Sequence, residues 1–421
     1  MRVIITLDSQ KRDSFASLLV AKSIRDFLKN RLEVEIFIAQ TSSDISRISL
    51  CCQKSIVIHN YSRPVNAWLI EKLKACGSLN YVLDTEGCPI WMFSSIGIQS
   101  HVFTKNLDGY FSWGEYQSEI ISKLKPKTRV IRCGSIRHQR LELSPNDIDE
   151  NCLILTSSPA VNPKLVSIEE NRNIIHRGLK GLPETEIDLM LEEQKQISKR
   201  IQDILRILPK KFRKVTLRVH PFESSIPYEK IFKGEKNVFL SNEIDISSDI
   251  SKSTLVIHGY STAGVEAVLS GKKVFTVAQS NNLPDWIKKY FKLISIGSKV
   301  ITTENLDEVI GPKNKNVFLS KEDKEKLDYY YGTNLSVEKS LEKINKEIHE
   351  QLLNIKVGFK ENFKRMTLAI LLIIRFFMMK SPKPNAKKLI STDTLQKIAL
   401  KEGIDVKLKE IVIKGGIWQV F

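Results

Sequence analysis

Two short stretches in the second half of the chain combine residue types that bind phosphate. Residues 218–223 read RVHPFE, and residues 258–266, about forty positions later, read HGYSTAGVE. Both follow apolar, β-branched runs, so we expect them at the carboxyl ends of strands in an open α/β sheet, where such sheets bind ligands. We interpret the two stretches as two walls of one nucleotide site.

The second stretch has the chemistry of an anion site. Ser261 and Thr262 are predicted at the start of a helix, where free backbone N–H groups and the helix dipole favour a phosphate. Gly259 and Gly264 would leave room for the phosphate, and Glu266 could accept hydrogen bonds from ribose hydroxyls. The alternative for Ser261 is a helix cap without a ligand.

The first stretch adds a histidine and an arginine. His220 is fixed by the following Pro221, and its ring can donate an N–H to a phosphate oxygen or to a leaving group. Arg218 and Pro221 are also expected at the nucleotide. The alternative for His220 is an ordinary loop histidine. Together the two stretches favour a functional site, because they occupy consecutive halves of one predicted α/β domain.

A pair of carboxylates lies in the first half of the chain. Asp84 and Glu86 follow the short apolar run 81–83 and precede Gly87, which permits a tight turn. A carboxylate at the carboxyl end of a strand can act as a general base toward an acceptor hydroxyl. The alternative is a solvated turn or helix cap, and both residues are retained as candidates for the base.

Alternating strands and helices are predicted to position these residues. The loop after the first strand contains no GxGxxG, so no dinucleotide signal is present there. The turn-rich residues 143–147 predict a domain boundary. The expected strands are 3–7, 34–39, 55–59, 81–83, 128–132, 152–156, 215–219, 237–240, 254–258 and 273–277. The expected helices include 15–27, 67–75, 117–124, 184–208 and 262–269.

Composition restricts the class of protein. With 65 Lys and Arg against 48 Asp and Glu, the net charge is +17, so we expect an anionic partner. A hydrophobic content of 42% and a charged content of 27% disfavour disorder and multiple membrane spans. The N-terminus reads as a strand rather than an export signal, which predicts a cytoplasmic protein. Neither a zinc site nor a disulfide framework is supported, because no CxxC pair occurs among Cys51, Cys52, Cys76, Cys88, Cys133 and Cys152.

The C-terminal part of the chain is the most basic. Residues 354–421 hold fourteen basic and five acidic residues. Within them, residues 356–379 combine lysines with an apolar run that is shorter than the roughly 20 residues of a membrane span and is interrupted by Arg375. Such a helix can lie in a membrane interface, and the alternative is a helix that packs across both domains. We expect residues 356–388 to attract an anionic membrane surface. Nucleic acid is not expected as a partner, because no basic motif interleaved with aromatic residues appears.

The ordered motifs resemble those of a known group of proteins. The sequences 84–87, 220–221 and 261–262 are similar to the acidic pair with glycine, the His-Pro motif and the Ser/Thr motif of bacterial CMP-sugar (sialyl, polysialyl and Kdo) transferases. Residues 12–21 and 262–272 resemble two helices of bacterial surface-carbohydrate biosynthesis proteins of the GT-B glycosyltransferase superfamily. The resemblance covers the chain from its first residue to about residue 310.

This resemblance implies a fold and an activity. The fold would be α/β and GT-B-like, with two Rossmann-like domains facing across a cleft and a C-terminal helical extension. The activity would be transfer of a sugar from a nucleotide donor, in particular a CMP-linked nonulosonic or Kdo-type sugar, onto a cell-surface polysaccharide or glycolipid. Glu86 or Asp84 would activate the acceptor, His220 would contact the donor phosphate or ribose, and neither a metal nor another cofactor would be needed.

Four segments and three alternatives complete these expectations. The alternatives are a polyol-phosphate transferase of the CDP-glycerol type, a nucleotide-sugar epimerase, and a non-catalytic assembly protein of a glycan-synthesis complex. The protein is expected in the cytoplasm, at the periphery of the inner face of the cell membrane. The last segment, with a helix at 392–401 and a strand at 406–413, would cover the cleft or pair with a partner chain. The expected segments are an acceptor domain at 1–148, a nucleotide-binding domain at 149–312, a helical segment at 313–380 and an appended tail at 381–421.

Overall fold

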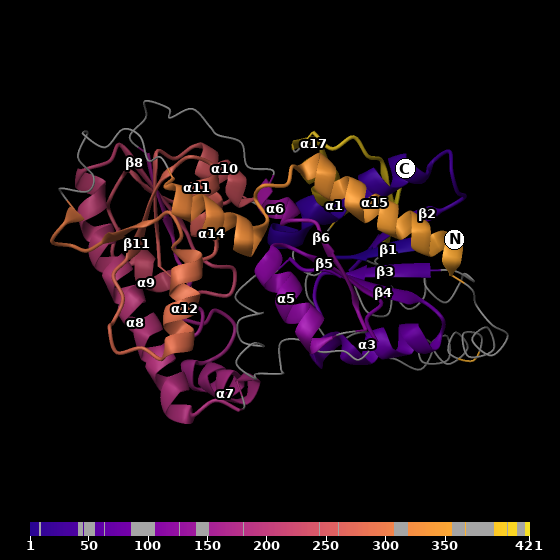
Figure 1. Cartoon of the computed structure of the whole chain (residues 1–421). Helices are drawn as coiled ribbons and strands as arrows, with labels where there is room; N and C mark the ends of the chain where they lie inside the picture. Colours follow the sequence, from indigo (N-terminus) through magenta and orange to yellow (C-terminus); the bar gives the residue numbers. More distant parts are fainter. Residues whose placement is uncertain are drawn as a thin grey trace, which may run out of the picture. The chain divides into compact units, whose positions relative to one another are not determined.

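The computed structural model of the chain forms two compact units (Figure 1). The first unit contains the described residues up to 139 together with those from 329 onward, and the second contains those between 151 and 328. The finer segment limits at 148, 312 and 380 stay predictions. The structure describes residues 1–7, 10–40, 45, 55–62, 64–85, 106–125, 127–139, 151–179, 181–243, 245–259, 261–306, 319–355, 367, 391–401, 403–410 and 417–421.

The first unit is built on a sheet of eight described strands in the order β13-β14-β2-β1-β3-β4-β5-β6. The six strands from β2 to β6 in this order are parallel, and their buried faces explain the continuous apolar runs in the sequence. The strands are β1 (Arg2–Thr6), β2 (Glu35–Ala39), β3 (Ser55–His59), β4 (Leu79–Leu83), β5 (Gly109–Ser112), β6 (Arg129–Arg132), β13 (Leu408–Glu410) and β14 (Ile417–Val420).

The second unit is built on a sheet of six described strands, all parallel, in the order β12-β11-β10-β7-β8-β9. Numbered within the unit, this order is 3-2-1-4-5-6 read from the β9 edge, which is the strand order of a Rossmann domain. The strands are β7 (Asn151–Leu155), β8 (Lys214–Arg218), β9 (Val238–Leu240), β10 (Leu255–His258), β11 (Lys273–Val277) and β12 (Lys299–Ile301).

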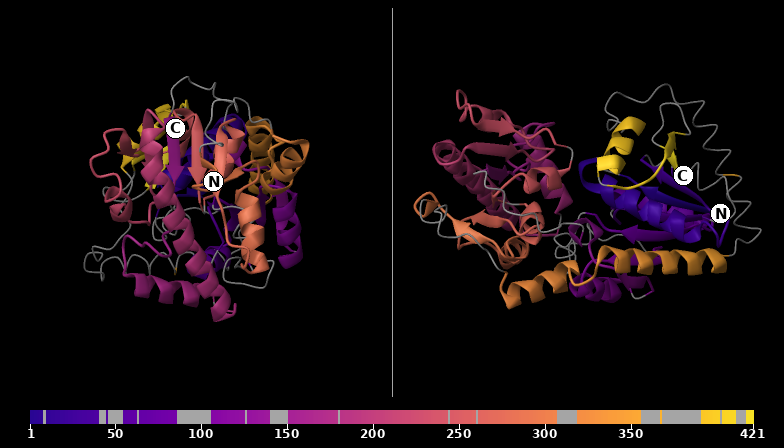
Figure 2. Two further views of the ribbon diagram at one scale, coloured as in Figure 1. Left: turned by 90° about the vertical axis from the view of Figure 1, so that its left-hand side faces the viewer. Right: turned by 90° about the horizontal axis from the view of Figure 1, so that it is seen from above.

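Helices connect the parallel strands and lie against the two sheets (Figures 1 and 2). The long amphipathic helix predicted from 184 is confirmed as α8 (Glu184–Ile207), with two glutamates in its first turn, where the helix dipole favours negative charge. The other helices of the first unit are α1 (Gln10–Leu28), α3 (Pro64–Ala75), α5 (Glu115–Leu124), α6 (Ile136–Gln139), α15 (Val337–Asn354) and α17 (Thr392–Lys401). The others of the second unit are α7 (Ile168–Gly178), η2 (Leu208–Lys210), α9 (Ile226–Glu229), α10 (Ile246–Ser251), α11 (Ala263–Leu269) and α12 (Asp285–Ile294), and α14 (Lys321–Tyr331) leads from the second unit to the first.

The end of the chain belongs to the sheet of the first unit. β14 pairs antiparallel with β2 through Ile417 and Ala39, and β13 pairs with β14. The tail thus extends the sheet of its own unit, and its expected role in covering a cleft or pairing with a partner chain stays a prediction. The strand expected at 406–413 is shorter in the described residues, and β14 was not expected at all.

Helix α15 is fixed to the first unit by a buried carboxylate. Glu347 is 5% exposed and accepts a hydrogen bond of 2.6 Å from the hydroxyl of Tyr81 in β4. The guanidinium of Arg129 in β6 lies 3.1 Å from the other oxygen of Glu347. Burial and then the hydrogen bond to Glu347 raise the pKa of Tyr81, so its hydroxyl remains a donor. In Figure 1, α15 runs beside α1, and Asn345 donates to the hydroxyl of Ser23 across this contact.

Replacing Trp418 in β14 is expected to destabilise the first unit. Its side chain is fully buried, and its indole N–H donates to Thr392 at 3.0 Å. We expect Trp418→Ala to lower the free energy of unfolding by about 3–5 kcal/mol, measured by urea denaturation. Trp68→Ala is the matched control, because Trp68 is 46% exposed and its removal leaves no buried cavity. Equal stabilities of the two variants would contradict the assignment of β14 to the core.

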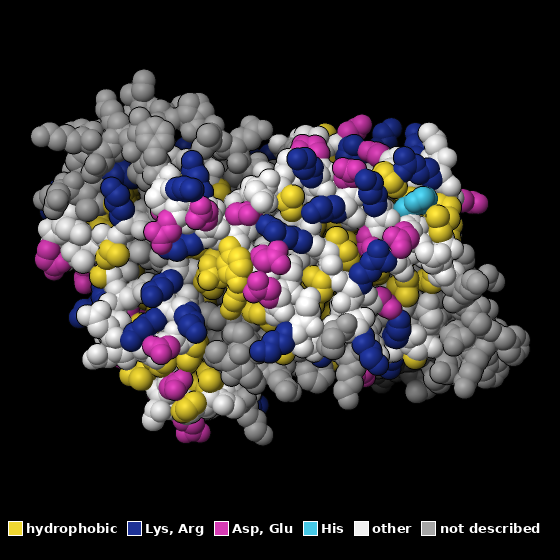
Figure 3. Space-filling view, viewed as in Figure 1, with side chains coloured by type: hydrophobic (Ala, Val, Ile, Leu, Met, Phe, Trp, Pro, Cys, Tyr) yellow, Lys and Arg dark blue, Asp and Glu magenta, His cyan; other side chains and the backbone are white. Residues whose placement is uncertain are grey.

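No helix in the described part of the chain is long and apolar enough to cross a membrane. The apolar run expected to lie at a membrane surface falls within 356–390, of which the structure describes only Thr367. On the face shown in Figure 3, Lys and Arg side chains are interspersed with Asp and Glu rather than gathered into one basic patch. Basic residues on this face therefore do not indicate a nucleic-acid groove.

Candidate functional site in the second unit

The two predicted phosphate-binding stretches follow strands that end at the same edge of the second sheet. The winding of the sheet reverses between β7 and its neighbour β10, and ligands of open α/β sheets bind at the carboxyl ends of strands at such a point. β8, on the other side of β7, leads into His220, and β10 leads into Gly259 and Ser261. The sequence correctly predicted that both stretches follow strands of one domain, and β7 lies between them.

The backbone around His220 sets the orientation of its ring. The N–H of His220 donates to the hydroxyl of Thr156, which follows β7, at 3.2 Å. The N–H of Phe222 donates to Nδ1 of His220 at 3.3 Å. Because Nδ1 accepts, a neutral ring carries its proton on Nε2. The imidazole thus presents Nε2 as a hydrogen-bond donor at the carboxyl end of β8.

A buried carboxylate that the sequence interpretation did not single out holds this loop. Glu223 is 2% exposed, and its Oε2 accepts from the hydroxyl of Thr156 at 2.7 Å and from the N–H of Ser158 at 3.0 Å. Its Oε1 accepts from the hydroxyl of Tyr228 at 2.6 Å. Burial and then the negative charge of Glu223 raise the pKa of Tyr228, so the phenol stays protonated. Thr156 therefore links Glu223 to the backbone of His220.

The hydroxyls of the second stretch have different surroundings. The N–H of Ala263 donates to Oγ of Ser261 at 3.3 Å, although Ser261 lies one position before Thr262, the N-cap residue of α11. Thr262 precedes the first residue of α11 and makes no side-chain capping bond. Both residues are partly exposed. Phosphate binding by Ser261 and Thr262 stays a prediction. Of the two hydroxyls, we expect that of Thr262 to donate more readily to a phosphate, because it makes no capping bond to the backbone.

The two glycines of this stretch are required by packing inside the unit. A Cβ on Gly264 would lie 2.4 Å from Nε2 of His258, and one on Gly259 would lie 2.4 Å from a methyl of Ile197 in α8. Burial lowers the pKa of His258 to about 4, so this imidazole is neutral and belongs to the core. Contact of either glycine with phosphate stays a prediction. Packing inside the unit is by itself a sufficient reason for glycine at both positions.

Three further predicted residues lie around this edge of the sheet. Glu266 is completely buried in α11, so contact with ribose would require the helix to move. The guanidinium of Arg218 lies 2.6 Å from Asp249, and Pro221 is exposed in the loop beside His220. The ion pair gives Arg218 a structural part in joining β8 to α10. Nucleotide contacts of Arg218, Pro221 and Glu266 stay predictions.

In the first unit, Asp84 follows β4 as expected and is 4% exposed. Its Oδ2 accepts from the hydroxyl of Tyr110 at 2.9 Å and from the amide of Gln117 at 3.2 Å. The indole N–H of Trp113 donates to the carbonyl of Asp84 at 2.8 Å. Asp84 is thus held in a fixed, buried position rather than in a solvated turn, and the alternative of a helix cap depends on residues outside the described ones. Glu86 and Gly87 lie outside the described residues.

A second polar group in the first unit was not predicted. At the carboxyl ends of β1 and β3, where the winding of the first sheet reverses, the side-chain amide of Asn60 donates to Asp13 at 2.8 Å. The N–H of Asn60 donates to the hydroxyl of Thr6 at 2.9 Å, and all three side chains are buried. The signal in the sequence is an asparagine directly after a continuous apolar strand. Among the described residues, no three His, Cys, Asp or Glu side chains are grouped so that they could hold a metal ion.

Comparison with known proteins places the fold. No protein-family profile and no curated protein sequence matches the chain. The wall teichoic acid polymerase TagF, in a histidine-to-asparagine variant soaked with CDPG, superposes with a TM-score of 0.51 and 14% identity over 84% of this chain and 89% of TagF. The complex of S. aureus MnaA with UDP gives a TM-score of 0.45 and 10% identity over 85% of this chain and 98% of MnaA. The complex of Anabaena HepE with UDP and glucose gives a TM-score of 0.41 and 12% identity over 83% of this chain and 99% of HepE. Together with the two strand orders, the similarity to TagF shows that the chain has the GT-B fold with two Rossmann-like units.

Proposed function

We propose that the chain is a GT-B transferase that moves a group from a cytidine-nucleotide donor to an acceptor hydroxyl of a cell-surface glycan. The observation that carries the proposal is the position of His220 at the carboxyl end of β8, which neighbours β7 at the switch point of the second unit. Its Nδ1 accepts from the N–H of Phe222, so a neutral ring carries its proton on Nε2, and we expect this N–H to face the departing phosphate. A donor at this position stabilises the negative charge that develops on the leaving nucleotide.

The proposed site divides its tasks between strand ends. His220 donates to the departing phosphate, and Thr262, with Ser261 beside it, adds hydroxyl donors from the end of β10. Glu86 or Asp84 takes the proton from the acceptor hydroxyl as general base. The hydrogen bonds from Tyr110 and Gln117 hold Asp84 in place, and the proposal keeps both carboxylates as candidates for the base.

The first candidate donor is a CMP-linked nonulosonic or Kdo-type sugar. The second is a CDP-linked polyol such as CDP-glycerol, and it is favoured by the fold similarity to TagF, whose histidine variant was soaked with CDPG. Both reactions release CMP: the first breaks the bond between the anomeric carbon and the phosphate oxygen, and the second breaks a phosphoanhydride bond. The same role of His220 serves both. Their products differ, because only polyol-phosphate transfer leaves phosphorus in the acceptor.

Nucleotide binding tests the proposal directly. We expect CMP and CDP at about 100 times their Kd to stabilise the protein by about 2.7 kcal/mol, which corresponds to a rise in Tm of several degrees. UDP and GDP should have much smaller effects in the same thermal-shift experiment. A preference for UDP would contradict the cytidine donor, and absence of a shift with all four nucleotides would favour a non-catalytic assembly protein. Phosphorus NMR of the acceptor product then separates the two candidate donors.

Location at a membrane is a further part of the proposal. The basic residues in the segment 356–388 would attract an anionic membrane surface and bring the transferase to a glycolipid acceptor. Support comes from the sequence, which concentrates lysines and apolar residues in this segment. The expected absence of a cofactor and of a metal also stays a prediction.

A further inference from the structure

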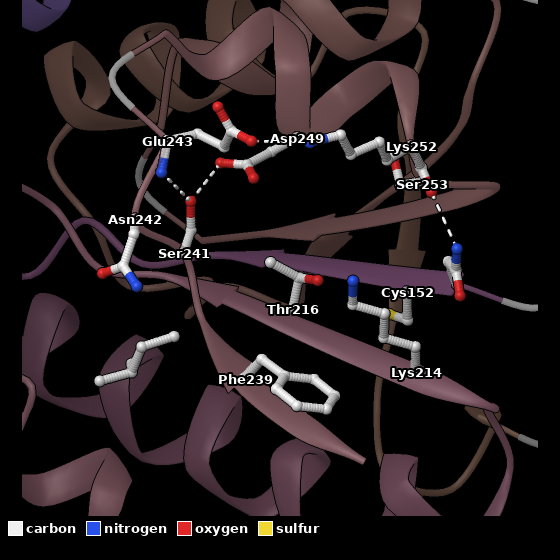
Figure 4. Close-up of a pocket in the computed structure, with 12 residues that line it drawn as sticks. Cys152, Lys214, Thr216, Phe239, Ser241, Asn242, Glu243, Asp249, Lys252 and Ser253 are labelled. Carbon is white, nitrogen blue, oxygen red and sulfur yellow. Dashed lines mark hydrogen bonds and ion pairs between the residues drawn. The ribbon is translucent and has the colours of Figure 1, made fainter.

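The second unit contains a cavity that includes none of the residues predicted to bind nucleotide. It has a volume of about 150 Å³ and lies beside the edge strand β9, on the face of the sheet that carries α10 (Figure 4). Lys214 and Thr216 project from this face of β8, and Phe239 is the register partner of Thr216 in β9. The ion pair between Arg218 and Asp249 attaches α10 to the same face, nearer the carboxyl ends of the strands. Arg218 thus bounds the cavity on the side of the carboxyl ends, where it also bonds Ser241 and the carbonyl of Glu243, and His220 is not among the lining residues.

The size of the cavity limits what it can hold. Sites that enclose drug-sized ligands usually measure about 300–1,000 Å³. A cavity of about 150 Å³ is too small for a nucleotide and suits a single ring or a phosphate group. The site is thus unsuited to the whole donor of the proposed reaction.

The lining offers an apolar ring surrounded by polar groups. The ring of Phe239 is 48% exposed, Figure 4 shows Lys214 and Thr216 next to it, and Asn242 also lines the cavity. The side chains of Thr216 and Asn242 make no hydrogen bond to any other described residue, so a hydroxyl and an amide are available to a ligand. An exposed aromatic face bordered by such groups suits a sugar, whose C–H face is apolar and whose rim carries hydroxyls.

The charges of the lining specify the ligand further. Glu243 is paired with Lys252 at 2.6 Å, and Asp249 is paired with Arg218. Lys214 is the cation of the lining that has no carboxylate partner among the described residues, and its ammonium group lies 5.4 Å from the centre of the Phe239 ring. A ligand with one negative charge would complete this set.

We propose that this cavity binds one sugar ring that carries a single negative charge. The C–H face of the ring lies against Phe239, the anionic group contacts Lys214, and hydroxyls bond to Thr216 and Asn242. The site would hold an acidic unit of a glycan away from the position where transfer occurs. Carboxylate and phosphate sugars share this chemistry, and the experiment distinguishes them.

Saturation-transfer NMR on the full chain provides the test. The probes are N-acetylneuraminic acid, glucose 6-(methyl phosphate), which is a diester with one negative charge, and neutral glucose. Inorganic phosphate, which has no carbon-bound protons to observe, is added as a competitor of the bound sugar. We expect at least one of the two acidic sugars to bind about tenfold or more tightly than glucose, which lacks the charge, and than inorganic phosphate, which lacks the ring. The acidic sugar that binds identifies the anionic group. Absence of binding by both, or equal binding of inorganic phosphate, would overturn the proposal.

Variants locate the binding. Phe239→Ala and Lys214→Ala alter exposed side chains, so the fold should persist, and each should weaken binding of the acidic sugar about tenfold. Lys236→Ala, at an exposed lysine just before β9, is the matched control and should bind as the unaltered protein does. Excess CMP should leave sugar binding unchanged. Displacement by CMP, or an equal loss in the Lys236 variant, would contradict this location whether or not the proposed transfer is correct.

Discussion

His220→Ala is expected to lower the rate of transfer about 100- to 10,000-fold without unfolding the protein. The change removes the Nε2 donor that would stabilise the departing CMP. The fold should persist because His220 and Phe222 are partly or largely exposed, so water can replace Nδ1 as the acceptor of the Phe222 N–H. The measurement is the initial rate of CMP release in the presence of acceptor, together with the thermal transition of each protein.

A histidine elsewhere in the second unit serves as the control. His176 in α7 lies 3.2 Å from Asp188 and is remote in sequence from both phosphate-binding stretches. His176→Ala should retain the rate of transfer, with a change in the free energy of unfolding of about 0.5 kcal/mol or less. Full activity of His220→Ala would rule out the proposed role of this residue.

Glu223→Ala is expected to destabilise the second unit by about 3 kcal/mol or more. The change leaves the hydroxyl donors of Thr156 and Tyr228 and the N–H of Ser158 without their buried acceptor. Each unsatisfied buried donor costs about 1–3 kcal/mol. Glu223→Gln keeps the shape and one acceptor oxygen, so we expect a loss of about 1–2 kcal/mol. Urea denaturation measures both losses.

The glutamine variant also separates stability from activity. The side chain of Glu223 reaches the backbone of His220 through Thr156, so it is a positioning residue, and Glu223→Gln should reduce kcat while nucleotide binding persists. Glu235→Ala, at an exposed glutamate of the same unit, should change neither property. If Glu223→Ala were as stable as the Glu235 variant, the buried network would not hold the loop.

The regular elements could be predicted because their patterns are local. Helix α8 follows from its apolar periodicity, and strands β8 and β10 follow from continuous β-branched runs that end in polar residues. We could also predict that β8 and β10 end at the same edge of the sheet, because parallel strands of one α/β domain place their carboxyl ends together. The position of Asp84 after β4 was predictable for the same reason.

Features that depend on distant parts of the chain could not be read from local pattern. A glutamate in a polar loop normally indicates a solvated side chain, and the burial of Glu223 depends on Thr156, which lies 67 positions earlier. Gly264 suggested space for a ligand, whereas the space is filled by the ring of His258. β14 is four residues long, and nothing in its sequence indicates that it pairs with β2.

The pairing of β14 with β2 also determines the order in which the chain can fold during synthesis. Domains generally fold as units while the ribosome adds about 5–20 residues per second, and the N-terminal domain is usually first. Here the first sheet includes residues 417–420 beside residues 35–39, whereas the described residues of the second unit all lie within 151–328. The second unit can therefore reach its native state on the ribosome while β2 still has an open edge. The N-terminal segment must remain protected from aggregation until translation has passed residue 420.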